Sequence, residues 1–163
     1  YQGAVLKFGY PNRKIALLHR HRMEFPVVDD LDIPGMGEIE GHYQPVCTCQ
    51  DGPATFGIGS LHSVMIHDAL DDVRAWTFRH EKYARWEAGM NRKRAWPVDP
   101  VPLRQRIKHL VRYSPLRALR PALFFIGAYV IKGGFRDGRG GWDLAARKYA
   151  YYQWIKTIES ALP

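Results

Sequence analysis

Residues 68–96, "DALDDVRAWTFRHEKYARWEAGMNRKRAW", carry the strongest secondary-structure signal in the chain. Val73, Trp76, His80 and Tyr83 recur at spacings of three and four residues, which is the period of one face of an α-helix. A run of aspartates precedes this face, where the positive end of the helix dipole favours negative charge. The stretch therefore predicts a long helix.

Helices are also predicted in the sequence that follows. From Pro102 the chain reads as helical again, with interruptions at Pro115 and Pro121, because proline lacks the backbone donor that a helix interior needs. Glycines at 133–134 are expected to end this stretch. A last helix is predicted over about residues 142–160.

The sequence ahead of these helices favours strands and loops. Residues 4–10 and 14–25 are rich in β-formers and are separated by turn residues. Prolines and glycines break the acidic stretch that follows, which predicts a loop with a short strand near residues 38–43. A further strand is predicted over residues 59–67, "GSLHSVMIH".

Together these elements indicate an α/β chain with a few mixed or antiparallel strands in residues 1–67 and three or more helices in residues 70–160. We expect residues 1–68 to hold the strands and the acidic loop, and residues 69–163 to form a helical region. The length of 163 residues is enough to bury a sizeable core.

Charge is distributed unevenly along the chain. Lysine and arginine number 24 against 16 acids, which gives a formal net charge of +8. The positive charge concentrates after residue 73, whereas residues 24–51 hold a cluster of acids. Such a balance favours a polyanionic partner, either nucleic acid, anionic lipid or a phosphorylated substrate.

Two further features of the sequence indicate the cellular compartment of the protein. Cys47 and Cys49 are too close for an ordinary disulfide and lack a second pair for zinc, so a reducing compartment is the simplest interpretation. The apolar run 121–131 is shorter than the roughly 20 residues that span a bilayer, and the start of the chain does not resemble a signal peptide. We expect a cytoplasmic protein that can lie on the inner face of the plasma membrane.

Two runs in the chain resemble a known family. Residues 66–89, "IHDALDDVRAWTFRHEKYARWEAG", and 129–156, "YVIKGGFRDGRGGWDLAARKYAYYQWIK", are similar to the C-terminal half of bacterial family 2 glycosyltransferases, especially those related to lipopolysaccharide-core glucosyltransferases. The resemblance is loose before residue 60 and more specific from Ile66 onward. The matching residues are His67, Lys82, Tyr83, Glu87, Ala88, Tyr129, Lys132, Gly134, Phe135, Asp137, Gly138 and Gly141.

The resemblance implies a partial GT-A-type domain that transfers a sugar from a nucleotide-sugar to a saccharide or lipid-linked acceptor, in cell-envelope polysaccharide or lipopolysaccharide synthesis. Members of the family carry a nucleotide-binding sheet, an "NEE"-like run and a metal-holding Asp-x-Asp in their first half. None of these lies ahead of the first predicted strand here, so the chain is expected to be the acceptor-side half, with the N-terminal half as a further partner.

The same resemblance implies the site residues. Glu40 is the expected general base for the acceptor hydroxyl, with Glu38 in reserve; on a strand the two would share one face. The alternative is two solvated acids. His67 is the expected ligand of a divalent metal, Mn²⁺ or Mg²⁺, bound with the nucleotide-sugar, although it could instead cap the following helix. His42 is a weaker candidate for binding acceptor or phosphate.

Three more residues are expected to bind donor or acceptor. Lys82 and Tyr83 lie on the predicted first helix, and Lys132 lies in the second matching run. A helical wheel places Arg79 with Lys82 and Trp86 on one face of that helix, which would commonly be a solvated face. His80, Tyr83 and Glu87 share another face.

Residues 102–135 interleave basic and apolar side chains, which is the composition of a helix lying at an anionic membrane surface. On this interpretation Phe124 and Phe125 would enter the headgroup region, while Arg112, Arg117 and Arg120 would be exposed. The alternative is a helix packed on the domain, with the phenylalanines in the core.

Two other functions remain open from the sequence. The five tryptophans and nine tyrosines could serve a basic nucleic-acid-binding module by stacking on bases, although aromatic residues at helical spacing more often pack in a core. A third possibility is a non-catalytic subunit that completes the transferase domain of another chain.

Overall fold

A computed structural model describes residues 5–9, 14–37, 39, 43–48, 59–62, 72–99 and 101–161 of the chain. The chain divides into two compact units, Asn12–Asp68 and a helical unit in which Tyr1–Pro11 joins Ala69–Pro163. The described residues form two antiparallel strands followed by four α-helices, which confirms the predicted mixed α/β composition and the order of its elements.

The strands are much shorter than predicted. β1 (Met23–Glu24) pairs antiparallel with β2 (Val46–Cys47), and Met23 lies opposite Cys47. The carbonyl of His19 accepts the N–H groups of Arg22 and Met23, so a turn occupies the middle of the predicted strand 14–25. In the predicted strands 4–10 and 59–67, the described residues 5–9 and 59–62 are not in strand conformation.

Side-chain hydrogen bonds explain why the acidic stretch forms turns. The carboxylate of Asp29 accepts the N–H of Leu31, and that of Asp30 accepts the N–H of Asp32, at 2.8 and 2.9 Å. Aspartate side chains that bond the backbone two residues ahead compete with strand pairing. Leu31 and Asp32 have φ angles of 58° and 55°, which an extended strand cannot contain.

The predicted long helix is confirmed as α1 (Val73–Lys93). The Asp72 carboxylate accepts the N–H of Arg74 at 2.8 Å and so caps the N-terminus. Arg92 and Lys93 lie in the last turn, where the negative end of the helix dipole favours them. Sequence signals at both ends therefore set the length of α1.

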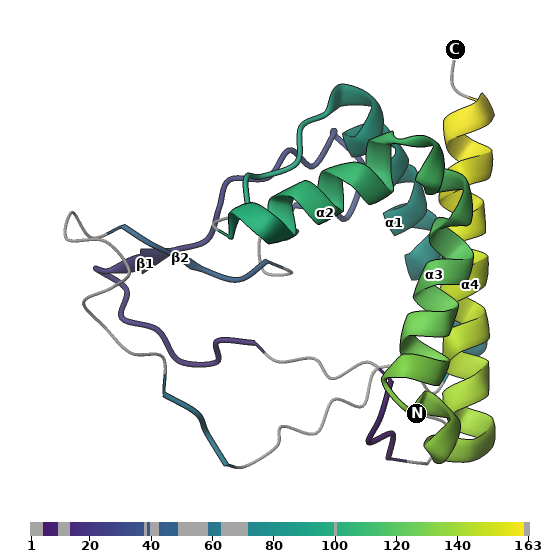
Figure 1. The fold of residues 1–163 in the computed structure, drawn as a ribbon. Helices are drawn as coiled ribbons and strands as arrows, with labels where there is room; N and C mark the ends of the chain where they lie inside the picture. Colours follow the sequence, from purple (N-terminus) through teal and green to yellow (C-terminus); the bar gives the residue numbers. More distant parts are fainter. Residues whose placement is uncertain are drawn as a thin grey trace. The chain divides into compact units, whose positions relative to one another are not determined.

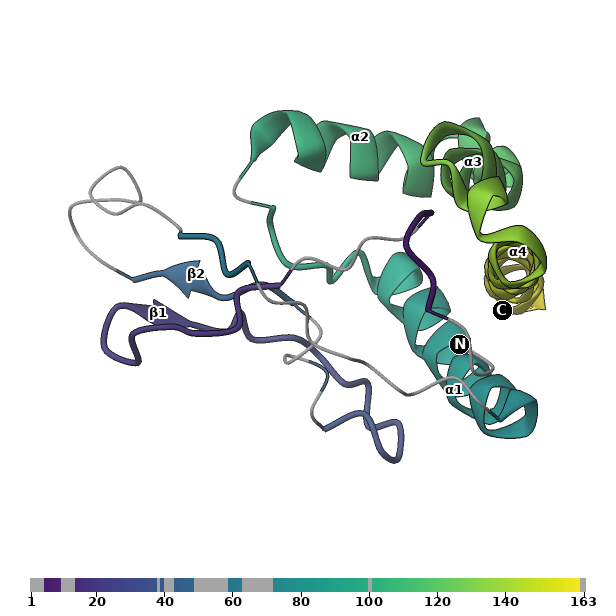
Figure 2. The ribbon, with the colours of Figure 1, turned by 90° about the horizontal axis from the view of Figure 1, so that it is seen from below.

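The core of the helical unit lies where α1 packs against α4 (Gly138–Ala161). Ala84 and Ala88 are completely buried one turn apart, so the two helices approach closely there. Trp76 from α1 and Ile155 from α4 are also buried in this cluster. Figure 1 shows α4 running beside α3, and Figure 2 looks nearly along α4.

The segment between α1 and α4 is a series of short helices. It comprises α2 (Pro102–Tyr113), a 3₁₀ turn η3 (Pro115–Leu119), α3 (Arg120–Ile126) and a π-helical turn η4 (Gly127–Ile131). The predicted break at Pro115 is present, because α2 ends there and η3 begins. The predicted break at Pro121 coincides with the first turn of α3, where proline is tolerated.

None of the helices in the described residues is by itself long and apolar enough to cross a membrane. The pair Pro115–Ile131 and Gly134–Ala161 satisfies the length and composition criteria only when taken together, and it is bent by 70°.

Glycines turn the chain from η4 into α4. Gly133 has a φ of 72°, and the 3₁₀ turn η5 (Gly134–Asp137) follows it. A Cβ atom on Gly141 would lie 1.9 Å from the Gly134 carbonyl oxygen, so no larger side chain fits there without moving the backbone. This close contact lets α4 begin at Gly138, ahead of residue 142, where the last helix was predicted to begin.

We expect Gly141→Ala to lower the free energy of unfolding by about 3 kcal/mol or more, because its methyl group would overlap a backbone oxygen. Gly127→Ala is the matched control. It lies in a helical segment where an added Cβ atom would meet only open space, and it should raise the free energy of unfolding by about 0.5–1 kcal/mol. Chemical denaturation of both variants tests the contact; equal stability would contradict it.

Candidate functional site

The carboxylate of Glu87 joins three helices in the interior of the helical unit. Glu87 is only 7% exposed. One carboxylate oxygen pairs with the guanidinium of Arg120 from α3, and the other accepts the hydroxyl hydrogen of Tyr151 from α4 at 2.8 Å. The negative charge is thus compensated by a cation and a neutral donor from two different elements.

Arg120 is buried, so the prediction that it is exposed is wrong. Its guanidinium carbon lies 4.4 Å from the ring centre of Tyr152 and 5.7 Å from that of Phe124. Burial opposes the positive charge, but the charge of Glu87 outweighs it and raises the pKa of Arg120 above its ordinary value. The Nε atom of Arg120 is buried without a hydrogen-bond partner among the described residues.

The two phenylalanines of α3 are partly buried against aromatic residues of α4. Phe124 stacks on Tyr152 of α4 with 4.1 Å between ring centres, and Phe125 meets Trp142 edge-on at 5.3 Å. These contacts favour the packed-helix alternative for Phe124 and Phe125.

His80 lies on the same inward face of α1 as Glu87. Its ring stacks on Trp76 at 3.8 Å and meets Tyr151 edge-on at 5.4 Å. Burial of the imidazole, together with the positive charge of Lys148, lowers its pKa from 6.5 to about 4. The neutral ring donates from Nδ1 to the Trp76 carbonyl, 2.9 Å away, because a carbonyl can only accept.

Two more ionisable groups complete this buried network. Burial and the charge of Glu87 raise the pKa of Tyr151 well above its ordinary value, so its hydroxyl remains a donor. Burial lowers the pKa of Lys148, and the attraction of Glu87 partly offsets that effect. The Tyr151 hydroxyl is therefore a fixed donor to Glu87, as the His80 ring is to the Trp76 carbonyl.

The second matching run of the sequence contacts the start of the chain. The Asp137 carboxylate accepts the backbone N–H groups of Lys7 and Phe8, at 3.1 and 2.8 Å. The N–H of Gly9 donates to the Lys132 carbonyl at 3.1 Å, and the Arg136 guanidinium lies 4.2 Å from the Phe8 ring centre. Residues 7–9 are therefore held by the loop between η4 and α4.

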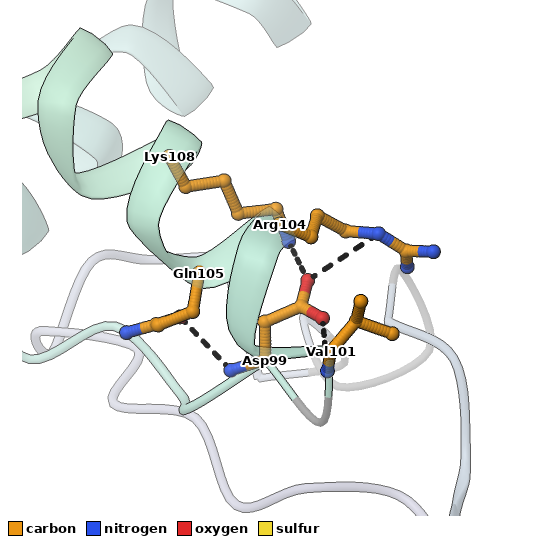
Figure 3. Close-up of polar contacts among 5 residues, drawn as sticks. All are labelled: Asp99, Val101, Arg104, Gln105 and Lys108. Atoms are coloured by element: carbon orange, nitrogen blue, oxygen red, sulfur yellow. Dashed lines mark hydrogen bonds and ion pairs between the residues drawn. The ribbon is translucent and has the colours of Figure 1, made fainter.

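A buried aspartate holds the first turns of α2 to the segment before it (Figure 3). The Asp99 carboxylate accepts from Lys108 at 2.6 Å and from the N–H of Val101 at 2.9 Å, with Arg104 3.9 Å away. The side chain of Gln105 accepts the N–H of Asp99 in return. Desolvation opposes ionisation of Asp99, but these cationic and backbone donors lower its pKa below the ordinary value.

The far end of α2 is anchored by aromatic contacts. The Arg112 guanidinium carbon lies 3.8 Å from the Trp96 ring centre, and the Trp96 indole donates to the Asn91 side chain at 2.7 Å. Asn91 in turn donates to Glu159 of α4 at 2.6 Å. One side of α2 is thus tied to the rest of the helical unit at both ends.

Three of the predicted site residues fall in the described part of the chain. Lys82 and Tyr83 lie on α1, where the Lys82 ammonium is 5.5 Å from the Tyr83 ring centre. The predicted solvated face of Arg79, Lys82 and Trp86 is wrong in one respect, because Trp86 is buried. Lys132 lines a cleft of about 230 Å³ with residues of α2, α3 and η4, and that cleft contains neither Lys82 nor Tyr83.

The other predicted site residues, Glu38, Glu40, His42 and His67, lie outside the described residues. Within the described ranges, no group of three or more histidine, cysteine, aspartate or glutamate side chains could hold a metal ion. Comparisons of the chain with protein-family models, with curated proteins and with solved structures found no match.

The polar network around Glu87 is not predicted by the sequence patterns. One signal for it is present, because an acid shares a helix face with aromatic residues, where a solvated carboxylate is not expected. Its partners Arg120 and Tyr151 are 33 and 64 residues away and cannot be assigned without the fold.

We expect Glu87→Ala to lower the free energy of unfolding by about 3–5 kcal/mol, because it leaves a buried arginine without its counter-charge. Tyr151→Phe removes one hydrogen bond to the carboxylate and should cost about 1–2 kcal/mol. The matched control is Glu81→Ala, which breaks an exposed pair with Arg85 on the same helix and should cost under about 1 kcal/mol. Denaturant titration would refute the network if Glu87→Ala were as mild as Glu81→Ala.

His80 also predicts a pH dependence of stability. Its pKa is lowered in the folded state, so the unfolded chain binds more protons between pH 6.5 and about 4, and acidification through that window should destabilise the fold. His80→Phe should flatten this part of the curve of melting temperature against pH. His62→Gln, a change at an exposed histidine, is the matched control. Identical curves for His80→Phe and the parent chain would contradict the lowered pKa.

Proposed function

We propose that this chain is the acceptor-side half of a family 2 glycosyltransferase, transferring a sugar from a nucleotide-sugar to a saccharide or lipid-linked acceptor in cell-envelope synthesis. The proposal rests on the resemblance of two sequence runs, in residues 66–89 and 129–156. The partner of this chain is a nucleotide-binding half that holds the donor. Another segment or another chain supplies that half.

The observation that best supports the proposal is the contact between Asp137 and the backbone of Lys7 and Phe8. Asp137 belongs to the glycine-rich run that carries the resemblance, and residues 7–8 precede the acidic loop that carries the expected base. The run therefore has a specific structural role in this chain, because it holds the backbone of residues 7 and 8. If the glycine-rich run made no such contact, the resemblance would support the proposal less strongly.

The buried network further limits where a base could be. Glu87 is fully engaged by Arg120 and Tyr151, and His80 is a neutral donor to a backbone carbonyl. Neither group is available to deprotonate an acceptor hydroxyl. Among the acids that the sequence singles out, Glu40 and Glu38 of the acidic loop remain the best candidates.

The proposed reaction is a displacement at the anomeric carbon. The acceptor oxygen forms a bond to that carbon while the bond to the donor phosphate breaks, and the hydroxyl proton passes to the Glu40 carboxylate. The nucleoside diphosphate leaves with the bonding electron pair. A divalent metal bound with the donor would neutralise charge on this diphosphate, and His67 is the residue of this chain proposed to contact it.

The packing of the tryptophans argues against a nucleic-acid-binding module. Trp76 and Trp86 are buried, and Trp154 packs against the same core as Trp76. Side chains that stack on bases must be accessible. Trp76, Trp86 and Trp154 therefore favour a packed helical scaffold over a stacking platform.

We expect Glu40→Gln, in the enzyme completed by its donor-binding half, to reduce sugar transfer by roughly 10²–10⁴-fold while leaving nucleotide-sugar binding nearly intact. Glu38→Gln is the matched control and should retain most activity. Transfer is measured with radiolabelled donor, and binding by calorimetry. If only Glu38→Gln were inactive, the base would be Glu38; if both variants were active, the proposed role of the acidic loop would be wrong.

A further inference from the structure

Helix α2 carries an apolar stripe whose side chains are more than half exposed. Leu103, Ile107 and Leu110 follow one another at spacings of four and three residues and are 68%, 53% and 51% exposed. No residue of α2 is buried. An amphipathic helix normally turns its apolar side to a core, so the exposed stripe requires an explanation.

A second exposed stripe follows on η3, α3 and η4. Its members recur at spacings of three and four residues, as one face of a helix does, and each is between 40% and 55% exposed. They are Leu116, Leu119, Leu123, Ile126 and Val130. This stripe is separate from Phe124 and Phe125, which pack toward α4. We call the two stripes together the α2–α3 face.

The stripe on α2 points away from the side by which that helix is anchored. Arg112, which lies over Trp96, is about 180° around the helix from Leu103. Lys108, which pairs with Asp99, is about 140° from Leu103. The anchoring contacts therefore fix α2 with its apolar side outward.

Helices α2 and α3 meet at a cleft of about 230 Å³. It is lined by Val111 of α2, which is not part of the first stripe, and by Leu123 of the second stripe, together with Phe124 and Lys132. Figure 2 shows α2 leading away from α3 at one end. The two stripes of the α2–α3 face therefore lie on helices that meet at one cleft.

Charge indicates what covers this face. Residues 100–136 contain eight lysines and arginines and no aspartate or glutamate. Asp99 and Glu87 compensate some of these cations, but Arg106 and Arg117 are exposed and make no ion pair with other described residues. Exposed apolar side chains flanked by cations, with no acid among them, match the headgroup region of an anionic bilayer.

We propose that the α2–α3 face docks on an anionic lipid bilayer, with its leucine, isoleucine and valine side chains entering the headgroup boundary and Arg106 and Arg117 meeting lipid phosphates. A second copy of the chain would place like charges opposite each other, which disfavours that occupant. The docking goes beyond the transfer reaction and does not depend on it, because lipid binding is measured without a sugar donor.

The test is sedimentation of the purified chain with vesicles of phosphatidylglycerol and phosphatidylethanolamine, compared with vesicles of phosphatidylcholine alone. We expect binding to the anionic vesicles that weakens as salt rises, because salt screens surface charge. Ile107→Ser with Leu110→Ser should weaken binding roughly tenfold or more, since both side chains are exposed in the free protein. Phe78→Ser, at an exposed aromatic of α1, is the matched control and should bind normally.

Charge is tested in the same way. Arg106→Gln with Arg117→Gln should weaken binding roughly tenfold. Arg92→Gln with Lys156→Gln removes the same charge elsewhere on the helical unit and should have little effect. Circular dichroism and melting temperature confirm folding of each variant; should the first serine pair unfold, Leu119→Ser with Val130→Ser takes its place.

Several outcomes would overturn the proposal. They are equal binding to both kinds of vesicle, no binding to either, or serine pairs that bind as tightly as the parent chain. Loss of self-association in the serine pairs, measured by sedimentation velocity, with unchanged lipid binding would instead make the face a contact between copies. Failure of transfer with intact vesicle binding would count against the proposed transferase and leave the docking face standing.

Discussion

Burial of the Glu87 carboxylate is the constraint on which the helical unit depends. A carboxylate removed from water is costly unless a cation and hydrogen-bond donors replace its hydration. Arg120 comes from α3 and Tyr151 from α4, so the charge is fully compensated only when all three helices are packed together. Apolar contacts such as those of Ala84 tolerate small slips between helices, whereas the carboxylate does not. The polar network thus specifies the packing that the apolar core stabilises.

The residues that carry the sequence resemblance mostly serve this architecture. Glu87 compensates a buried arginine, Gly141 admits a carbonyl oxygen against α4, and Asp137 holds the backbone of residues 7–8. Each of these roles needs one residue type for a physical reason. In the proposed enzyme the helical unit is therefore a scaffold, and the bond-making groups belong to the acidic loop and to the donor-binding half.

Local signals allow the helices to be predicted, because capping and periodicity are properties of neighbouring residues. The aromatic spacing and the aspartate cap predict α1, and the glycines predict the end of the α3 segment. The length of the predicted strand 14–25 is overestimated because the hydrogen bonds of the His19 carbonyl form a turn within it, whereas the turns at Asp29 and Asp30 agree with the predicted loop. The burial of Arg120 escapes prediction, since its partner is 33 residues away. Of the expected binding residues, Lys82, Tyr83 and Lys132 lie in described helical segments, and their binding roles stay predictions.

The contact between Asp137 and the backbone near residue 7 also bears on how the chain folds. Its partners are 130 residues apart, whereas the turn from η4 through η5 into α4 forms between neighbours. Closing a long loop costs more chain entropy than closing a short one, so such a contact is expected late, after the helices have assembled. Only backbone N–H groups of Lys7 and Phe8 take part. This final step of assembly therefore constrains the path of the backbone at residues 7 and 8, and proline, which has no backbone N–H, could not make either hydrogen bond.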